Sequence, residues 1–274
     1  CDIPASLVSD YDIKVVPAYV IWDGEQYRDR IDLEAAAFYR RLESDAVYPT
    51  SAHPSPEDFL TAYQAARAGG AEEIVVITVS SAMSSTYSAA QHAATQTDTP
   101  VHIVDSRGPT MSLGWQVLAA ARARATGADA QAMVTVADAV RARMAQLVYM
   151  DAIKYLEKGG RIGNAVSLVG TLLRIRPVVY IDHETGVVEV EGIARTRRRG
   201  IETMVRGFYK RLDRQCPIHV AVLHGNVPGE AKALATRIKR ELNPVELLVN
   251  VTGPVLGINT GPGALALAGY SEPR

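Results

Sequence analysis

The sequence has very few cysteines and no apolar run long enough to cross a membrane. Only Cys1 and Cys216 occur among 274 residues, which argues against a disulfide framework and fits a reducing compartment. The longest apolar runs, such as 74–79, fall far short of the ~20 residues that a membrane-spanning helix needs. No signal peptide precedes them. We therefore expect a soluble, cytoplasmic protein without an integral membrane segment.

An excess of one charge is lacking as well. The chain has 29 Lys and Arg against 30 Asp and Glu, a net charge of −1, so no overall field attracts nucleic acid. The local exception is the basic run Arg195–Arg199. The hydrophobic share of 47% is ordinary for a globular protein, and the length allows one large domain or two modest ones.

Several motifs of enzyme chemistry are also missing. The six histidines show no HExxH spacing and no CxxC occurs, so we expect no transition-metal site. There is no GxSxG motif, which weakens a hydrolase interpretation. No GxGxxG follows the early strands, and the glycine-rich loop 253–263 lacks the Gly-Lys-Ser/Thr ending of a P-loop. The sequence therefore predicts no metal and no nucleotide cofactor.

Short β-rich runs alternate with helical patterns, which is typical of βα units around a mainly parallel sheet. Ser55–Asp58 combines a capping serine with a proline and two acids, a strong helix start. His183–Gly186 lies between two apolar runs and predicts an antiparallel hairpin. A short helix is expected to complete the chain. We predict two α/β lobes, 1–148 and 149–274, with a small-molecule site between them.

Hydroxyl groups gather where predicted strands end. Ser80–Tyr87 follows the apolar run 73–79 directly, and the carboxyl end of a parallel strand faces the ligand crevice. Hydroxyls and free N–H groups there suit a small anion. The alternative is a serine-rich helix cap. A second cluster, Thr50–Pro56, precedes a helix; capping explains its Ser55 but leaves Thr50 and Ser51 without a role.

Taken together and in order, these segments resemble the DegV family of bacterial lipid-binding proteins. The matching segments are 15–17, 23–29, 49–56, 80–87, 104–106, 155–162, 175–177 and 260–264. They run nearly end to end, so the ordered set is far more specific than any one motif. The family usually opens with a strand that ends Thr-Asp-Ser just before the position of Cys1, and we expect such a strand ahead of this sequence.

The resemblance implies one long-chain fatty acid bound between two α/β domains. It also implies a carrier, not an enzyme: a subunit that presents the acyl carboxylate to a separate ATP-dependent fatty-acid kinase in phospholipid metabolism. The residues expected to bind the carboxylate are Thr50, Ser51, Ser80, Ser81, Ser84 and Asn259. Those expected to support them are Arg161, Thr260 and Gly261.

The sequence departs from the family pattern at two positions. Asn259 stands where the family often carries histidine, two residues before a Gly-Pro-Gly turn. Asparagine donates a hydrogen bond but cannot become cationic or relay a proton, so carboxylate binding is retained while competence for phosphoryl transfer is in question. Ser85 replaces a common glycine, a change that we expect to be tolerated.

Two other functional classes are open. A stand-alone enzyme would use Ser81 or Ser84 as nucleophile, although no base for it is evident. A regulatory or interaction protein would use the basic run Arg195–Arg199. Arginines at a helix start are disfavoured by the helix dipole, so we expect an outside partner for Arg195 and Arg198, such as an acidic face of the kinase. The alternative is a solvated turn.

Overall fold

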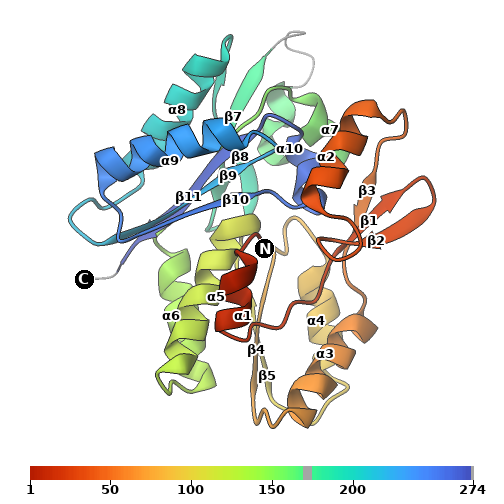
Figure 1. Cartoon of the computed structure of the whole chain (residues 1–274). Coiled ribbons are helices and arrows are strands. Elements are labelled where there is room, and N and C mark those ends of the chain that lie inside the picture. The colour runs from red at the N-terminus through yellow and green to blue at the C-terminus, as the bar shows by residue number, and fades with distance from the viewer. Residues whose placement is uncertain (169–174, 273–274) are drawn as a thin grey trace.

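Two α/β lobes make up the computed structural model, which describes residues 1–168 and 175–272 (Figure 1). The lower lobe in that view contains a two-stranded parallel sheet with helices on both sides. Its elements are α1 (Ala5–Asp10), α3 (Pro56–Ala68), β4 (Ile74–Thr78), α4 (Thr86–Ala94), β5 (Val101–Asp105), α5 (Thr110–Ala125) and α6 (Ala130–Arg141). Helix α4 contacts β4 and β5, and helices α5 and α6 both contact β4.

The upper lobe contains a six-stranded sheet in the order β10-β9-β11-β6-β7-β8. Its strands are β6 (Met144–Tyr149), β7 (Arg176–Asp182), β8 (Val187–Ala194), β9 (Ile218–His224), β10 (Glu246–Val251) and β11 (Leu265–Ser271). Only β9 and β10 run parallel in this sheet, so the expectation of a mainly parallel sheet is wrong there. Among the named strands of residues 1–168 and 175–272, parallel pairing occurs at β4–β5 and β9–β10.

Strand β11 is one of the elements that the sequence analysis missed, as are α1, β2 (Glu25–Arg28) and β3 (Thr50–Ala52). Strand β11 lies between β9 and β6 and runs antiparallel to both. The pairs β6–β7 and β7–β8 are antiparallel as well, so the sheet is mixed. The sequence of β11, LALAGYS, contains alanine and glycine, which have low β propensity, yet all seven residues are buried. Strand β6 starts at Met144 and belongs to the same sheet. By sheet membership, the lobe boundary that we proposed after residue 148 lies a few residues earlier.

Helices cover one face of the six-stranded sheet. Helices α8 (Arg197–Lys210) and α9 (Pro228–Leu242) pack there over a core that contains Leu147, Phe208 and Val222. Helix α5 contacts the other face at β6 and β11, and Trp115 and Leu118 pack there against Val179 and Leu223. This second face looks toward the lower lobe (Figure 1).

A small antiparallel sheet joins the two lobes at one side. It has the order β2-β1-β3 and packs, with α2, against α10 through a shared core around Trp22, Phe38 and Ile258. Its elements and the remaining helices are β1 (Tyr19–Trp22), β2 (Glu25–Arg28), α2 (Ala35–Ser44), β3 (Thr50–Ala52), α7 (Lys154–Gly159), a 3-10 helix (Gly163–Leu168) and α10 (Pro254–Thr260).

Local signals in the sequence correspond well to the structure. Ser55 and Asp58 form the reciprocal capping box at the start of α3, and β7 and β8 form the predicted hairpin. Helix α7 ends at Gly160, which adopts the left-handed conformation with φ +72°, a conformation that glycine adopts without steric cost.

A nearly buried histidine links three strands at the far edge of the large sheet. His219 Nδ1 and Nε2 lie 2.8 Å from carboxylate oxygens of Glu246 and Glu272, respectively, and its ring stacks on Tyr270. Burial lowers the pKa of His219, but the hydrogen bonds that its ring donates to the two carboxylates outweigh that effect, and the net pKa is raised. The fold therefore favours the protonated form of His219.

We predict that His219→Gln makes stability less dependent on pH above 6. A raised folded-state pKa means that the charged histidine contributes fully below its unfolded pKa of about 6.5, and that this contribution disappears as pH rises through the higher folded value. The wild type should therefore exceed the variant by about 1–2 kcal/mol at pH 6 and by much less at pH 9. Denaturant unfolding at several pH values measures this, with the exposed His92→Gln as control. A difference that is constant with pH would contradict the assignment.

Candidate functional site

A large cavity lies between the two lobes and has a volume of about 1380 Å³. Its upper wall is the sheet face that α8 and α9 do not cover, and its lower wall comes from β4, α5 and the extended segment 13–18. Apolar side chains on these walls include Val76, Leu113, Val117, Val148, Val179 and Ile181. The volume exceeds the ~300–1,000 Å³ of typical small-molecule sites, so space alone does not limit the length of a ligand.

Polar groups from both lobes meet on the lining of this cavity. Ser84 lies in the loop between β4 and α4, and its Oγ is 2.8 Å from Oγ1 of Thr86, which also lines the cavity. Arg161, which follows α7, donates from Nε to the carbonyl of Met83 at 3.4 Å. The Arg161 guanidinium thus links the upper lobe to the loop that carries Ser84. Hydroxyl and guanidinium donors of this kind bind carboxylates.

The last turn of α10 adds an amide to the polar lining. Asn259 donates from Nδ2 to the carbonyl of Val255 at 3.0 Å, while its buried Oδ1 has no partner among the described residues. Gly159 of α7 packs against this side chain: a Cβ at position 159 would lie 2.1 Å from Asn259 Oδ1. The glycine at the end of α7 therefore leaves the room that Asn259 occupies.

The structure brings together only part of the predicted carboxylate site. Of the nine residues that we expected to bind or support the carboxylate, five line the cavity: Ser51, Ser84, Arg161, Asn259 and Thr260. Four lie outside its lining: Thr50, Ser80, Ser81 and Gly261. The five residues come from four separate parts of the chain, which fits one composite site.

Two of the four outlying residues form other hydrogen bonds. Ser80 is fully buried, and its Oγ donates to the carbonyl of Gly186 in the β7–β8 turn at 2.8 Å. Ser81 is exposed, and its Oγ donates to Asp105 at 2.5 Å. Ser80 therefore connects the lobes, and Ser81 ties the loop after β4 to the end of β5.

An acidic pair near the start of α10 is a feature that the sequence analysis did not identify. Asp2, Asp29 and Arg30 all line the cavity. Arg30 donates to Asp2 at 2.5 Å, and Asp2 and Asp29 accept from the backbone N–H groups of Gly253 and Val255. Burial, with the neighbouring Asp2 carboxylate, raises the pKa of Asp29 to about 6. Asp2 is far from Asp29 and Arg30 in the sequence and lies outside the matching segments, so no motif indicated that they meet.

The acidic pair and the polar lining lie at opposite ends of α10. This helix is seven residues long and ends at Thr260, so it spans about 10 Å at 1.5 Å per residue. An anionic ligand group is repelled by Asp2 and Asp29. It is therefore expected near Ser84 and Asn259.

The basic run 195–199 lies at the start of α8, outside the cavity lining. Arg197 forms ion pairs with Asp151 and Glu230 and is partly buried. Arg195 and Arg198 are exposed. Thr196 caps the helix by accepting from the N–H of Arg199. The run thus divides into one structural arginine and side chains that face solvent.

Metal-binding clusters and membrane-spanning helices are both absent from residues 1–168 and 175–272. Within those residues, no three His, Cys, Asp or Glu side chains gather in a way that could hold a metal ion. No described helix combines the length and apolar character needed to cross a bilayer.

Together these features define a two-lobed α/β protein with an internal apolar cavity and a polar cluster on its lining. A sequence model of the DegV family matches residues 1–272, and the chain belongs to that family. DegV domain-containing proteins of Clostridium acetobutylicum and Streptomyces coelicolor are 34% and 31% identical to it. Each of these alignments covers 97% of this chain and 93% of the relative.

Solved structures agree with this assignment. The fatty-acid-binding DegV family protein of Thermus thermophilus superposes with a TM-score of 0.91 at 29% identity, over 98% of this chain and 96% of that one. A DegV lipid-binding protein of Thermotoga maritima superposes with a TM-score of 0.90 at 25% identity, over 100% and 96% of the two chains. The resemblance read from the motifs is confirmed, as are the two α/β lobes.

We predict that Ser80→Ala destabilises the fold, whereas Ser81→Ala has little effect. Removing the Ser80 hydroxyl leaves the Gly186 carbonyl without its donor in a buried contact between the lobes, which should lower the free energy of unfolding by about 1–3 kcal/mol. The Ser81–Asp105 bond is exposed and should contribute well under about 1 kcal/mol. Denaturant titration of both variants decides this. Equal destabilisation would contradict the bridging role of Ser80.

Proposed function

We propose that this protein binds one long-chain fatty acid in the cavity between its lobes and acts as a carrier. The observation that supports this most is the combination of apolar walls with neutral donors on one cavity. Family membership adds to it, because the DegV protein of Thermus thermophilus binds a fatty acid. In this proposal, Ser84, Asn259 and Arg161 contact the carboxylate, and Ser51 and Thr260 support them.

The energetics of this assignment are favourable. Burial of an apolar chain of ~16 carbons contributes about 0.8 kcal/mol per methylene, or roughly 12 kcal/mol in all. Association and ordering offset much of that gain. The remainder is still enough to retain a lipid. The carboxylate adds specificity through hydrogen bonds from a hydroxyl and an amide, which stabilise the anion without a fully buried counter-charge.

The surroundings of the two candidate nucleophiles favour a carrier over a stand-alone enzyme. Ser84 is hydrogen-bonded to Thr86, whose hydroxyl is not a general base at neutral pH. Ser81 is bonded to Asp105 on the surface, outside the cavity lining. Neither arrangement presents an activated serine to a ligand inside the cavity.

We predict that Ser84→Ala lowers fatty-acid affinity by about 10-fold or more. A hydrogen bond to a charged group contributes about 1.5–3 kcal/mol, and 1.4 kcal/mol corresponds to a factor of ten. Titration of delipidated protein with hexadecanoic acid measures the affinity, and mass spectrometry of the intact complex gives the stoichiometry. Ser81→Ala is the matched control, because it removes a neighbouring hydroxyl that lies outside the cavity. No binding of hexadecanoic acid to the wild type would contradict the carrier function. Equal losses of affinity in Ser84→Ala and Ser81→Ala would mean that the carboxylate does not bind at Ser84.

We further propose that the bound carboxylate is presented to a separate ATP-dependent kinase in the cytoplasm, in service of phospholipid synthesis. The exposed Arg195 and Arg198 offer a basic surface for an acidic partner. Asn259, in place of a histidine, can hold the carboxylate but cannot relay a proton. Any proton transfer during phosphorylation must then come from the partner.

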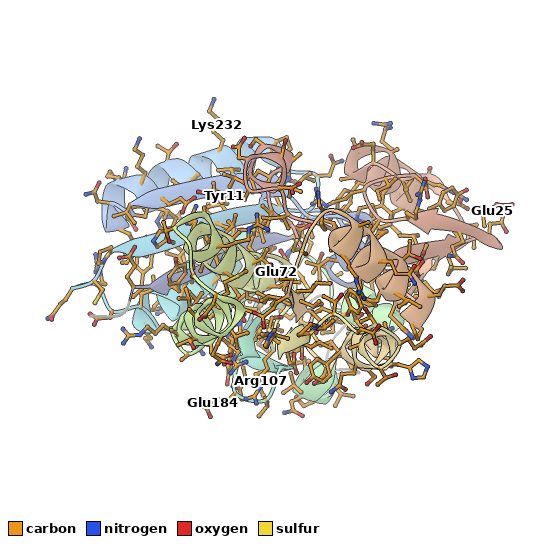
Figure 2. The ribbon with its side chains drawn as sticks, turned by 90° about the horizontal axis from the view of Figure 1, so that it is seen from below. Tyr11, Glu25, Glu72, Arg107, Glu184 and Lys232 are labelled. Atoms are coloured by element: carbon orange, nitrogen blue, oxygen red, sulfur yellow. The ribbon has the colours of Figure 1, made fainter. Side chains whose placement is uncertain are left out.

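We predict that Arg195→Glu with Arg198→Glu slows acyl-phosphate formation by about 10-fold at low salt and leaves fatty-acid affinity unchanged. Exposed charges steer encounter, and salt screens them over ~8–10 Å at physiological ionic strength. A kinase-coupled assay at two salt concentrations measures the rate, beside a lipid titration. Lys232→Glu is the control, since Lys232 points into solvent from α9 (Figure 2). Equal rates for the wild type and the double variant would contradict a docking role for Arg195 and Arg198, and the basic run would then be a solvated turn.

A further inference from the structure

A small side pocket adjoins the main cavity behind the start of α5 and α10. Its volume is about 10 Å³, close to the space that one water-sized group occupies. It shares Thr110, Gln146 and Thr260 with the lining of the main cavity, and Thr252 adds another hydroxyl. The remaining walls are apolar, so a polar group that enters the pocket meets these side chains.

Gln146 is the unusual residue of this pocket. It lies within β6, opposite Ala268 of β11, and only 1% of its surface is exposed. Its amide oxygen and its amide nitrogen both lack partners among the described residues. A buried polar group without a hydrogen bond is costly and rare in native proteins, so this amide calls for a partner that comes from the cavity.

The direction of the side chain follows from strand geometry. Successive residues of a strand point to opposite faces. Ala145 and Leu147 pack in the core under α8 and α9, whereas Gln146 and Val148 line the cavity. The amide is therefore placed on the ligand side of the sheet, among apolar neighbours.

Only some chemical groups satisfy such an amide. A hydroxyl both donates and accepts, so one hydroxyl can donate to Oε1 of Gln146 and accept from its Nε2. A carboxylate only accepts, so it can accept from Nε2 of Gln146 but cannot donate to its Oε1. A ketone or an ester also lacks the donor. The pocket therefore matches an alcohol.

We propose that the side pocket binds a hydroxyl group carried by the acyl chain, so that this protein prefers hydroxy fatty acids. The inference rests on the proposed fatty-acid function and specifies its ligand class. Thr260 borders the side pocket and directly follows Asn259, which is assigned to the carboxylate. The hydroxyl therefore belongs on a carbon close to the carboxylate, as in a 3-hydroxy acid.

The test compares three ligands of equal chain length on the delipidated protein. They are hexadecanoic acid, 3-hydroxyhexadecanoic acid and 16-hydroxyhexadecanoic acid. The wild type should bind the 3-hydroxy acid about tenfold more tightly than hexadecanoic acid, because two neutral hydrogen bonds are gained and a buried amide is satisfied. The 16-hydroxy acid carries the same group at the far end and should gain nothing.

Substitution then assigns the preference to the pocket. In Gln146→Leu, the ratio of the affinities for the 3-hydroxy acid and hexadecanoic acid should fall to about one. Val179→Ala alters the wall of the main cavity, outside the side pocket, without removing a hydrogen-bonding group, and should keep the ratio. If Gln146→Leu does not fold, the three-ligand comparison on the wild type decides alone.

Two outcomes overturn the inference. Equal binding of hexadecanoic and 3-hydroxyhexadecanoic acids by the wild type would mean that the side pocket holds only water. A preference that survives in Gln146→Leu would place the hydroxyl elsewhere. In both cases hexadecanoic acid still binds and the carrier function stands. If none of the three acids binds, the proposed function itself has failed.

Discussion

The six-stranded sheet has two apolar faces, and helices of the upper lobe cover only one of them. Helices α8 and α9 bury Leu147 and Val222 on that face. The opposite face carries Val148, Val179 and Ile181, and α5 covers it only in part. Exposed apolar surface of this extent is unfavourable in water. The lower lobe therefore has to lie against the sheet, and the cavity forms where the two lobes do not meet.

The same constraint determines what kind of head-group site is possible. A charge inside an apolar cavity is costly unless it is paired or hydrogen-bonded. The acidic residues Asp2 and Asp29 are held by Arg30 and by backbone N–H groups at the start of α10. At the other end of that helix, the lining offers hydroxyl and amide groups. The helix thus separates a part of the cavity that rejects anions from a part that accepts them.

Much of the local secondary structure could be predicted from the sequence. The capping box at Ser55, the β7–β8 hairpin and the glycine stop after α7 are local signals, decided within a few residues. Strand β11 could not be predicted in this way, because its burial between β9 and β6 overrides the weak β propensity of alanine and glycine. The expectation of a mainly parallel sheet was wrong in the upper lobe, because β11 pairs antiparallel with both its neighbours and β6, β7 and β8 pair antiparallel as well.

The sequence predicted which segments contribute to the candidate site, but not which of their side chains line the cavity. The motif around Ser80–Ser84 was found, but position in a motif does not tell which hydroxyl faces a cavity. Ser80 and Ser81 are turned to Gly186 and Asp105, and Ser84 alone of the three lines the cavity. Gln146 stood as a single polar residue within an apolar run, and its role depends on an adjoining pocket made by four other elements.

The contacts between the lobes explain why sequence says so little about how they are joined. Ser80 donates to the carbonyl of Gly186, Arg107 to that of Glu184, and Arg161 to that of Met83; Arg107 and Glu184 lie together at one edge of the molecule (Figure 2). Each bond ends on a backbone oxygen, which every residue possesses. The acceptor position therefore carries no side-chain signature, and only the donor is visible in the sequence. Each such bond is also modest in net free energy, about 0.5–3 kcal/mol. The shared apolar core of Trp115 and Leu118 with Val179 and Leu223, and the Arg122–Glu246 ion pair, hold α5 on the large sheet, so these hydrogen bonds position the loops at the seam and do not by themselves hold the lobes together.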